Sequence, residues 1–425
     1  MKFKNVSKFK IYSNYGKVLP LTGKGNFTNI MVFQSLYDDS VRVSFTLADA
    51  GYRYKQKNAV SLEEEEDLKI TVGEKVELKL NDNKGREIDT EVYVEEVTNS
   101  SSSAFAEMFS ITCSSKDFYE NKKIKNSPTY HFEGKIHEIV KKILEDILGT
   151  SQEIHLDPTL NSLPINGRRS DNPLDFCTAL APKSIPEKYP QFSGYYFYNT
   201  LEGYHFKSID MLFMQDPKRK MIYNQSTGMG PKYTNKILNI KFYHNMNISN
   251  IMHTASLTKS EIETFDVYTH GYSNDQWSHD DTYQIFNNAG KEKPIIATEL
   301  KIQDEASTIV NQFWNTGTLP PGSNLGSQLP FSKQPTFDIQ GIVRKSIARY
   351  NQALLYRATI TIHGDFEIYP GDIIECDFPE ISNKINTKSI SRKKSGKWLV
   401  CDVSHFINAE HCYTKLNIIR DSIMK

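Results

Sequence analysis

The chain has 425 residues, of which 38% are hydrophobic and 24% charged, so about three domains with sizeable cores are expected rather than disorder. Lys and Arg together number 51, and so do Asp and Glu. This balance excludes a global field that would attract nucleic acid or a membrane surface, so any contact with DNA is expected to be passive passage.

Five scattered cysteines without Cys-x-x-Cys spacing predict buried free thiols in a reducing compartment, rather than a disulfide framework or a zinc knuckle. They are Cys113, Cys177, Cys376, Cys401 and Cys412. The first residues contain no apolar stretch typical of a signal peptide, and no run of about 18 apolar residues occurs anywhere. We therefore expect a protein that is made in the cytoplasm and contacts no membrane.

The first third of the chain predicts strands. Val41, Val43, Phe45 and Leu47 alternate with polar residues, which is typical of a half-buried strand. Similar alternation follows in three further segments, 70–80, 91–97 and 108–114. These segments predict a first β domain over residues 1–118.

The middle of the chain changes to helical spacing. Apolar residues recur at three- and four-residue steps from Ile136 to Leu148, and Gly149 stands where a glycine would end the helix. A second helix is expected from Ser170, with Pro173 in its first turn. An aromatic hairpin follows over residues 193–209, with its turn near Glu202–Gly203. An α+β domain is therefore expected over 119–232.

The last part of the chain returns to strands. Alternating segments at 356–378 and 397–421 follow a helix expected over Ile342–Leu355. Together with strands after residue 235 they predict a second β domain, built from 233–255 and 341–425. The intervening residues 256–340 form an inserted region of unassigned role.

A weak internal repeat relates the two β domains. Residues 70–80 align with 368–378 at an offset of 298, so that Gly73 meets Gly371 and each glycine is followed by an acidic residue. Strands on both sides of the aligned segments also correspond. Two similar barrels in one chain would let three chains present six units, enough to continue a six-fold ring. The alternative is that two unrelated hairpins share a glycine–acidic turn.

Five segments, 35–49, 168–183, 193–206, 356–378 and 397–421, resemble the central hub proteins of T-even-type contractile phage baseplates. They are also similar to late-control tail proteins and the base domains of type VI secretion spikes. The resemblance implies an α+β, β-rich fold with two tail-tube-like antiparallel β-barrel domains, a helix and hairpin domain, and an inserted domain. It implies a homotrimeric structural protein of the virion tail baseplate, assembled in the host cytoplasm, without catalytic residues or cofactors.

The same resemblance implies a set of partners. The trimer would join a six-fold tail tube or tube-initiator protein to a three-fold spike protein, beside the tape measure protein and the baseplate wedge proteins, with DNA only in transit during genome ejection. The chain departs from the family in the long insertion at 256–340. No spike extension follows its second β domain, which favours a separate spike partner.

Two groups of residues are candidates for roles in such an assembly. The acidic run Glu63, Glu64, Glu65 and Glu66 is either a solvated loop or a rim of the channel, where negative charge would repel phosphates. Aromatic side chains of the hairpin must point to both faces of a strand, so their cover comes from the chain's own core or from a neighbouring subunit. The candidates for contact with a neighbouring subunit are Tyr195, Tyr196, Tyr198 and Tyr204.

Chemical motifs are weak. His405 with His411, and His270 with His279, lack the spacing of a zinc site, so no metal is expected. Ser256-x-x-Lys259 lacks the companion motifs of penicillin-binding enzymes.

Two other functions remain as alternatives to a structural hub. A tail-associated cell-wall hydrolase would need carboxylates from the inserted region, such as Asp280, Asp281 and Glu299. A receptor-binding module is suggested by the high tyrosine content.

Overall fold

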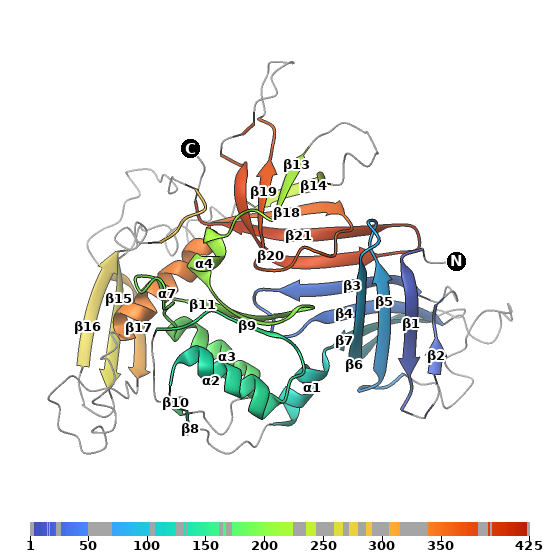
Figure 1. Ribbon diagram of the computed structural model, residues 1–425, viewed down its shortest axis with the longest axis horizontal. Helices are drawn as coiled ribbons and strands as arrows, with labels where there is room; N and C mark the ends of the chain where they lie inside the picture. The colour runs from blue at the N-terminus through green and yellow to red at the C-terminus, as the bar shows by residue number, and fades with distance from the viewer. Residues whose placement is uncertain are drawn as a thin grey trace.

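A computed structural model describes most of the chain. The described residues are 4–14, 16, 18–22, 27–49, 70–102, 107–124, 131–132, 134–160, 165–166, 172–223, 235–243, 259–266, 272–278, 286–290, 306–314, 339–380, 390–391 and 393–422. Two β units share one sheet of 13 strands, and a layer of helices with a three-stranded sheet lies beside it (Figure 1).

The first β unit is an antiparallel sheet of seven strands. Their order is β3 (Phe27–Ser35), β4 (Arg42–Asp49), β7 (Glu107–Ser114), β6 (Glu87–Ser102), β5 (Lys75–Asn81), β1 (Val6–Tyr12) and β2 (Val18–Pro20). The alternation predicted for β4 is confirmed, because Val43, Phe45 and Leu47 are buried. Phe9 of β1 packs edge-on against Phe27 and Phe45, with ring centroids 5.0 and 4.9 Å away. The sheet therefore folds over a single apolar core.

The second β unit is a closed barrel of six strands. Their order is β14 (Lys236–Tyr243), β18 (Tyr356–His363), β21 (Cys412–Arg420), β20 (Gly396–Ile407), β19 (Ile373–Asp377) and β13 (Arg219–Tyr223). β13 closes it by pairing with both β19 and β14, and both pairings are parallel. The barrel is therefore not antiparallel throughout, in contrast to the expectation. β13 also lies within the range 119–232 predicted for the α+β domain.

An α+β layer packs against the β units. Its helices are α1 (Lys116–Lys123), α2 (Ile136–Lys142) continued by a π-helical turn to Leu148, α3 (Pro173–Leu180) continued by a 3₁₀ turn to Lys183, and α4 (Ile209–Met214). Its strands are β9 (Ile154–Leu156), β11 (Tyr195–Thr200) and β12 (Gly203–Ser208) in one sheet, and the short pair β8 (His131–Phe132) and β10 (Ile165–Asn166). The helix over 136–148, its end at the left-handed Gly149 and the aromatic hairpin are confirmed.

The inserted region contributes a separate sheet. Strands β15 (Lys259–Asp266), β16 (Tyr272–Ser278) and β17 (Ala306–Trp314) form it, in the order β16-β15-β17. It lies beside α7 (Ile339–Ala353), at the opposite end of the molecule from the N-terminus (Figure 1). α7 confirms the helix predicted from Ile342. Its C-terminal residue Ala353 shares a buried cluster with Tyr196 and Tyr198 of the hairpin layer and with residues of the barrel strands β19, β20 and β21.

Candidate functional site: a duplicated strand unit and its open face

The two aligned glycines occupy the same structural position. Both have positive φ, +88° at Gly73 and +93° at Gly371, which favours glycine. The Gly73 N–H donates to the carbonyl of Val94 at 2.8 Å, and the Val94 N–H donates to the carbonyl of Glu74, the residue after the glycine, at 2.9 Å. Gly371 and Val400 form the same reciprocal pair, at 2.9 and 2.9 Å. The two turns are therefore equivalent, and are not a chance similarity of two hairpins.

The equivalence extends to whole strands. The order β3-β4-β7-β6-β5 of the first unit corresponds to β14-β18-β21-β20-β19 of the second, and every pairing in both runs is antiparallel. A one-residue bulge interrupts both central strands at the same place, at Glu95 in β6 and at Cys401 in β20. Bulges are specific features of a sheet rather than defects. The internal repeat predicted from the sequence is thus a repeat of structure.

The two units are joined edge to edge by backbone pairing of β20 with β3. The register runs from Asp402 opposite Ser35 to Ile407 opposite Ile30. Core-facing residues on both sides of this junction, such as Val32 and Val403, are fully buried. The junction therefore makes one continuous core-covering sheet out of two units.

An ionic cluster ties the units together a second time. The Asp365 carboxylate, which is only 3% exposed, lies 3.0 Å from Lys84 Nζ, 2.6 Å from an Arg86 nitrogen and 3.0 Å from Arg219 Nε. Burial alone would raise the pKa of Asp365. The hydrogen bonds from Lys84 and from the Glu367 N–H, with the nearby Arg219 charge, outweigh burial and hold that pKa below its ordinary value.

Eight neighbouring strands, β14-β18-β21-β20-β3-β4-β7-β6, form a run with two different faces. One face covers the two cores. We call the other the open face. Hydroxyl and amide side chains are the most numerous on it, and charged and aromatic side chains lie among them. Its residues include Asn239, Lys241, Tyr243, Arg357, Thr359, Thr361, His363, Tyr413, Lys415, Asn417, Asp402, Ser404, Phe406, Met31, Phe33, Ser35, Arg42, Ser44, Thr46, Ser110, Thr112, Glu96 and Thr98.

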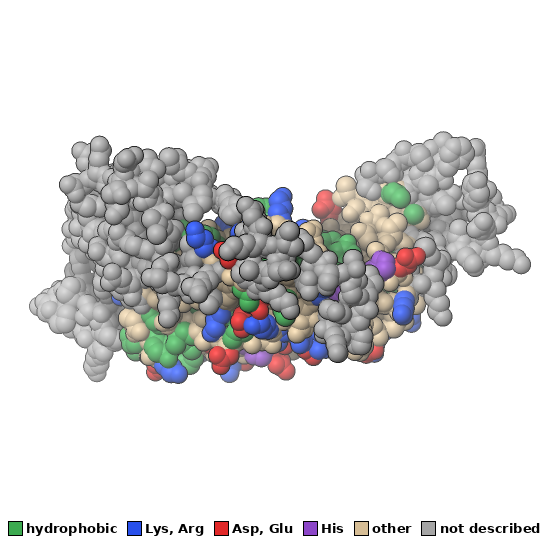
Figure 2. Space-filling model, turned by 90° about the horizontal axis from the view of Figure 1, so that it is seen from above, with side chains coloured by type: hydrophobic (Ala, Val, Ile, Leu, Met, Phe, Trp, Pro, Cys, Tyr) green, Lys and Arg blue, Asp and Glu red, His purple; other side chains and the backbone are tan. Residues whose placement is uncertain are grey.

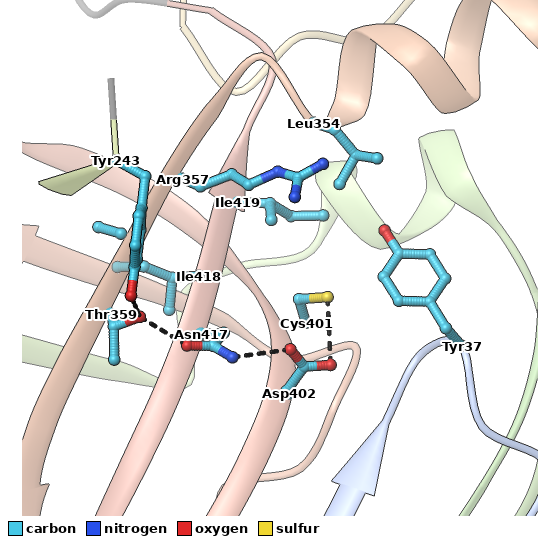
Figure 3. A pocket seen from close by; sticks show the side chains of 11 residues that line it. Tyr37, Tyr243, Leu354, Arg357, Thr359, Cys401, Asp402, Asn417, Ile418 and Ile419 are labelled. Atoms are coloured by element: carbon cyan, nitrogen blue, oxygen red, sulfur yellow. Dashed lines mark hydrogen bonds between the residues drawn. The ribbon is translucent and has the colours of Figure 1, made fainter. Parts of the chain in front are cut away.

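A chain of hydrogen bonds crosses the open face in the second unit (Figure 3). The Thr359 hydroxyl donates to Asn417 Oδ1 at 2.6 Å, and Asn417 Nδ2 donates to Asp402 at 2.9 Å. The Ser35 hydroxyl donates to the same carboxylate at 2.5 Å and so continues the chain into β3. These bonds fix the strands relative to one another and leave no free base or acid for catalysis along this row.

A pocket of roughly 370 Å³ opens beside this row, between Tyr37, Tyr243 and Leu354. Burial and the neighbouring Asp402 raise the pKa of the Cys401 thiol well above its ordinary value. This thiol is therefore not an activated nucleophile.

A fully buried ion triad joins α4, α7 and the residue after β21. Arg349 lies 3.0 Å from Asp210 and 2.7 Å from Asp421. All three side chains also bind the backbone of residues 286–290: Arg349 donates to the Asn287 carbonyl, Asp210 accepts from the Asn287 N–H, and Asp421 accepts from the Ala289 N–H. Burial raises the pKa of Asp210 to about 6, against the opposing effect of Arg349. Without access to solvent, the triad has a structural role.

The four candidate tyrosines are covered by the protein's own interior. Tyr195 and Tyr204 lie in the core under α2 and α3, and Tyr196 and Tyr198 lie on the opposite face of the hairpin, against α4 and β19. None is more than 4% exposed. The chain's own residues therefore bury these four rings, which is one of the two alternatives expected from the sequence. In the described structure the rings have no exposed surface with which a neighbouring subunit could make contact.

The other candidates are placed only in part. Glu63, Glu64, Glu65 and Glu66 lie outside the described residues, as do Asp280, Asp281 and Glu299. All five cysteines are free and buried, as expected. Within the described ranges no group of three His, Cys, Asp or Glu side chains could hold a metal ion, and no helix is long and apolar enough to cross a membrane. On the face shown in Figure 2, acidic and basic side chains are interspersed among the described residues.

Comparison with known proteins shows that the fold of this chain is similar to that of solved structures. No family model matches the sequence, and no curated protein matches it. The structure is similar to the 43 kDa tail protein of prophage MuSo2 from Shewanella oneidensis, with a TM-score of 0.54 and 10% identity over 98% of this chain and 100% of that one. A tail protein from Neisseria meningitidis MC58 has a TM-score of 0.52 and 10% identity, over 97% and 96% of the two chains.

The chain thus has the fold of phage tail proteins over almost its whole length. Both similar structures are tail proteins by name. A type VI secretion component of Escherichia coli has a TM-score of 0.41 and 7% identity, which does not by itself establish a common fold.

Proposed function

We propose that this protein is a structural hub subunit of a contractile phage tail baseplate, acting as a homotrimer. The observation that carries the proposal is the duplicated strand unit: two equivalent units in one chain make a three-fold assembly look six-fold to its neighbours. A ring of three chains would then fit a six-fold tail tube on one side and a three-fold spike on the other.

The size of such a ring can be estimated from the sheet. Three copies of the eight-strand run would supply about 24 strands. With strands roughly 4.8 Å apart and tilted by about 40°, the cylinder would be about 48 Å across at the backbone. That is wide enough for a DNA duplex after side chains are added. Genome passage through the bore is therefore part of the proposal.

The open face is the surface we assign to the bore. Its most numerous side chains carry uncharged hydroxyl or amide groups, and Arg42 at its edge is paired with Asp38 at 3.0 Å. The exposed cations Lys241, Arg357 and Lys415 also lie on this face. Because a cation that contacts a phosphate releases counterions, we expect any binding of the bore to DNA to weaken as salt increases. The proposed partners are the spike protein, the tail tube or tube-initiator protein, the tape measure protein and the baseplate wedge proteins.

Native mass spectrometry and electron microscopy of the purified full-length protein test this function. A trimer that forms a ring with six similar lobes and a central channel is the expected result. A monomer at all concentrations, or a solid particle without a channel, would refute the proposal. Purified protein should also leave cell walls intact in a turbidity assay, since lysis would favour a hydrolase.

A further inference from the structure

Two strand edges of the eight-strand run have no strand beside them among the described residues. At one end, β6 pairs with β5 only up to Tyr93, so the outer edge from Glu95 to Ser102 is open. At the other end, β14 pairs with β13 only at Lys236 and Ile237, so its outer edge from Ile240 to Tyr243 is open. Such edges are templates for pairing with another chain.

We propose that these two edges pair with each other between copies, β6 of one copy against β14 of the next, as an antiparallel continuation of the sheet. The proposal rests on the hub function proposed above and names the contact that closes its ring. The partner is a second copy of this chain, because the chain already contains the same junction internally: β20 and β3, which correspond to β6 and β14, pair with each other.

The internal junction fixes the register of the proposed one. The hydrogen-bonded turns place Val94 where Val400 lies, so Thr98 corresponds to Ser404. The strand pairings likewise place Phe242 where Val32 lies.

Ser404 is opposite Phe33 in the internal junction, and Phe33 corresponds to Tyr243. The inferred junction therefore sets Thr98 of one copy opposite Tyr243 of the next, and Asn99 opposite Phe242.

Burial supports the same pairing. At the internal junction, the core-facing Ile30, Val32 and Val403 are each 0% exposed. Their counterparts at the free edges are also apolar, namely Ile240, Phe242 and Val97, but these are only partly buried. The apolar side chains at the free edges are thus only half covered in the single chain. A neighbouring strand from another copy would bury them, as the internal junction buries their counterparts.

A disulfide tests the register in the full-length protein. Directly opposed residues of antiparallel strands have Cα atoms about 4.5–5.5 Å apart, within the range of a disulfide. Thr98 and Tyr243 are exposed in the single chain, and all native cysteines are buried, so Thr98→Cys with Tyr243→Cys adds accessible thiols without disturbing a core. Within one chain the two sites stand seven strand spacings apart, roughly 30 Å, so a bond between them joins two copies.

After mild oxidation, the double variant is expected to run as a covalent trimer on a denaturing gel without reductant, and each single variant as a monomer. The matched control pairs Thr98→Cys with Lys241→Cys, which lies on the same face but two residues out of register, at about 7–8 Å. Equal cross-linking of the control would overturn the register. A wild-type trimer whose double variant stays unlinked would overturn the junction but not the hub function, whereas a monomeric wild type would overturn the hub function itself.

Discussion

Substituting alanine at the two equivalent glycines gives a matched test of the repeat and its surroundings. Both residues have φ near +90°, where a Cβ costs about 1–2 kcal/mol. At Gly73 an added Cβ meets no described atom within 4 Å. At Gly371 it would lie 2.4 Å from the hydroxyl oxygen of Tyr198, a side chain that is itself only 2% exposed.

We therefore expect Gly73→Ala to lower the free energy of unfolding by about 1–2 kcal/mol, from backbone strain alone. Gly371→Ala should lower it by about 2–5 kcal/mol, because overpacking against Tyr198 adds about 1–3 kcal/mol. Urea denaturation followed by tyrosine fluorescence and circular dichroism measures both. Equal losses, or a larger loss at Gly73, would refute the reasoning. Tyr198→Phe in the Gly371→Ala background should recover part of the loss, because it removes the clashing oxygen.

Three further outcomes are expected. Asp365→Asn should lower the free energy of unfolding by about 2 kcal/mol at pH 7. Glu367→Gln, which changes a half-exposed neighbour in the same cluster, should lower it by only about 0.5 kcal/mol. Because folding lowers the pKa of Asp365, the stabilisation by this carboxylate is complete above about pH 4 and is lost as the pH falls through the folded pKa. Denaturation curves in which the effect of Asp365→Asn stays constant down to about pH 3 would contradict this. Arg349→Ala should cost about 3–5 kcal/mol in the same assay, since it leaves Asp210 buried without its cation, and a loss below 1 kcal/mol would contradict a buried triad. The five buried thiols should react with Ellman's reagent only after denaturation, and rapid reaction of the native protein at pH 8 would be inconsistent with their burial.

Local patterns predicted the elements that depend on neighbouring residues. The helix from Ile136, its end at Gly149 and the alternating β4 follow from side-chain periodicity and glycine conformation, and the structure has them. The repeat could be predicted because the turns at Gly73 and Gly371 both require glycine, so the same glycine–acidic pair recurs in the sequence at both turns.

Features that depend on distant residues were not visible. The cover over the aromatic hairpin comes from α2, α3, α4 and β19, which are brought together only by the tertiary fold. The same holds for β13, whose five residues carry little periodic signal and whose two neighbours in the barrel follow it in the chain. The junction of β20 with β3 also left no local pattern, although the repeat implied some arrangement of the two units.

The junction of β20 with β3 has a consequence for how the protein is made. Ser35 is synthesised 367 residues before its hydrogen-bond partner Asp402. At about 5–20 residues per second, the edge of β3 waits roughly 20–70 seconds on the ribosome before β20 emerges. During that time an apolar strand edge, with Ile30 and Val32 on it, is available to nascent chains nearby. Correct folding of this protein therefore requires that β20 of the same chain pairs with the edge of β3 before a neighbouring nascent chain on the polysome does.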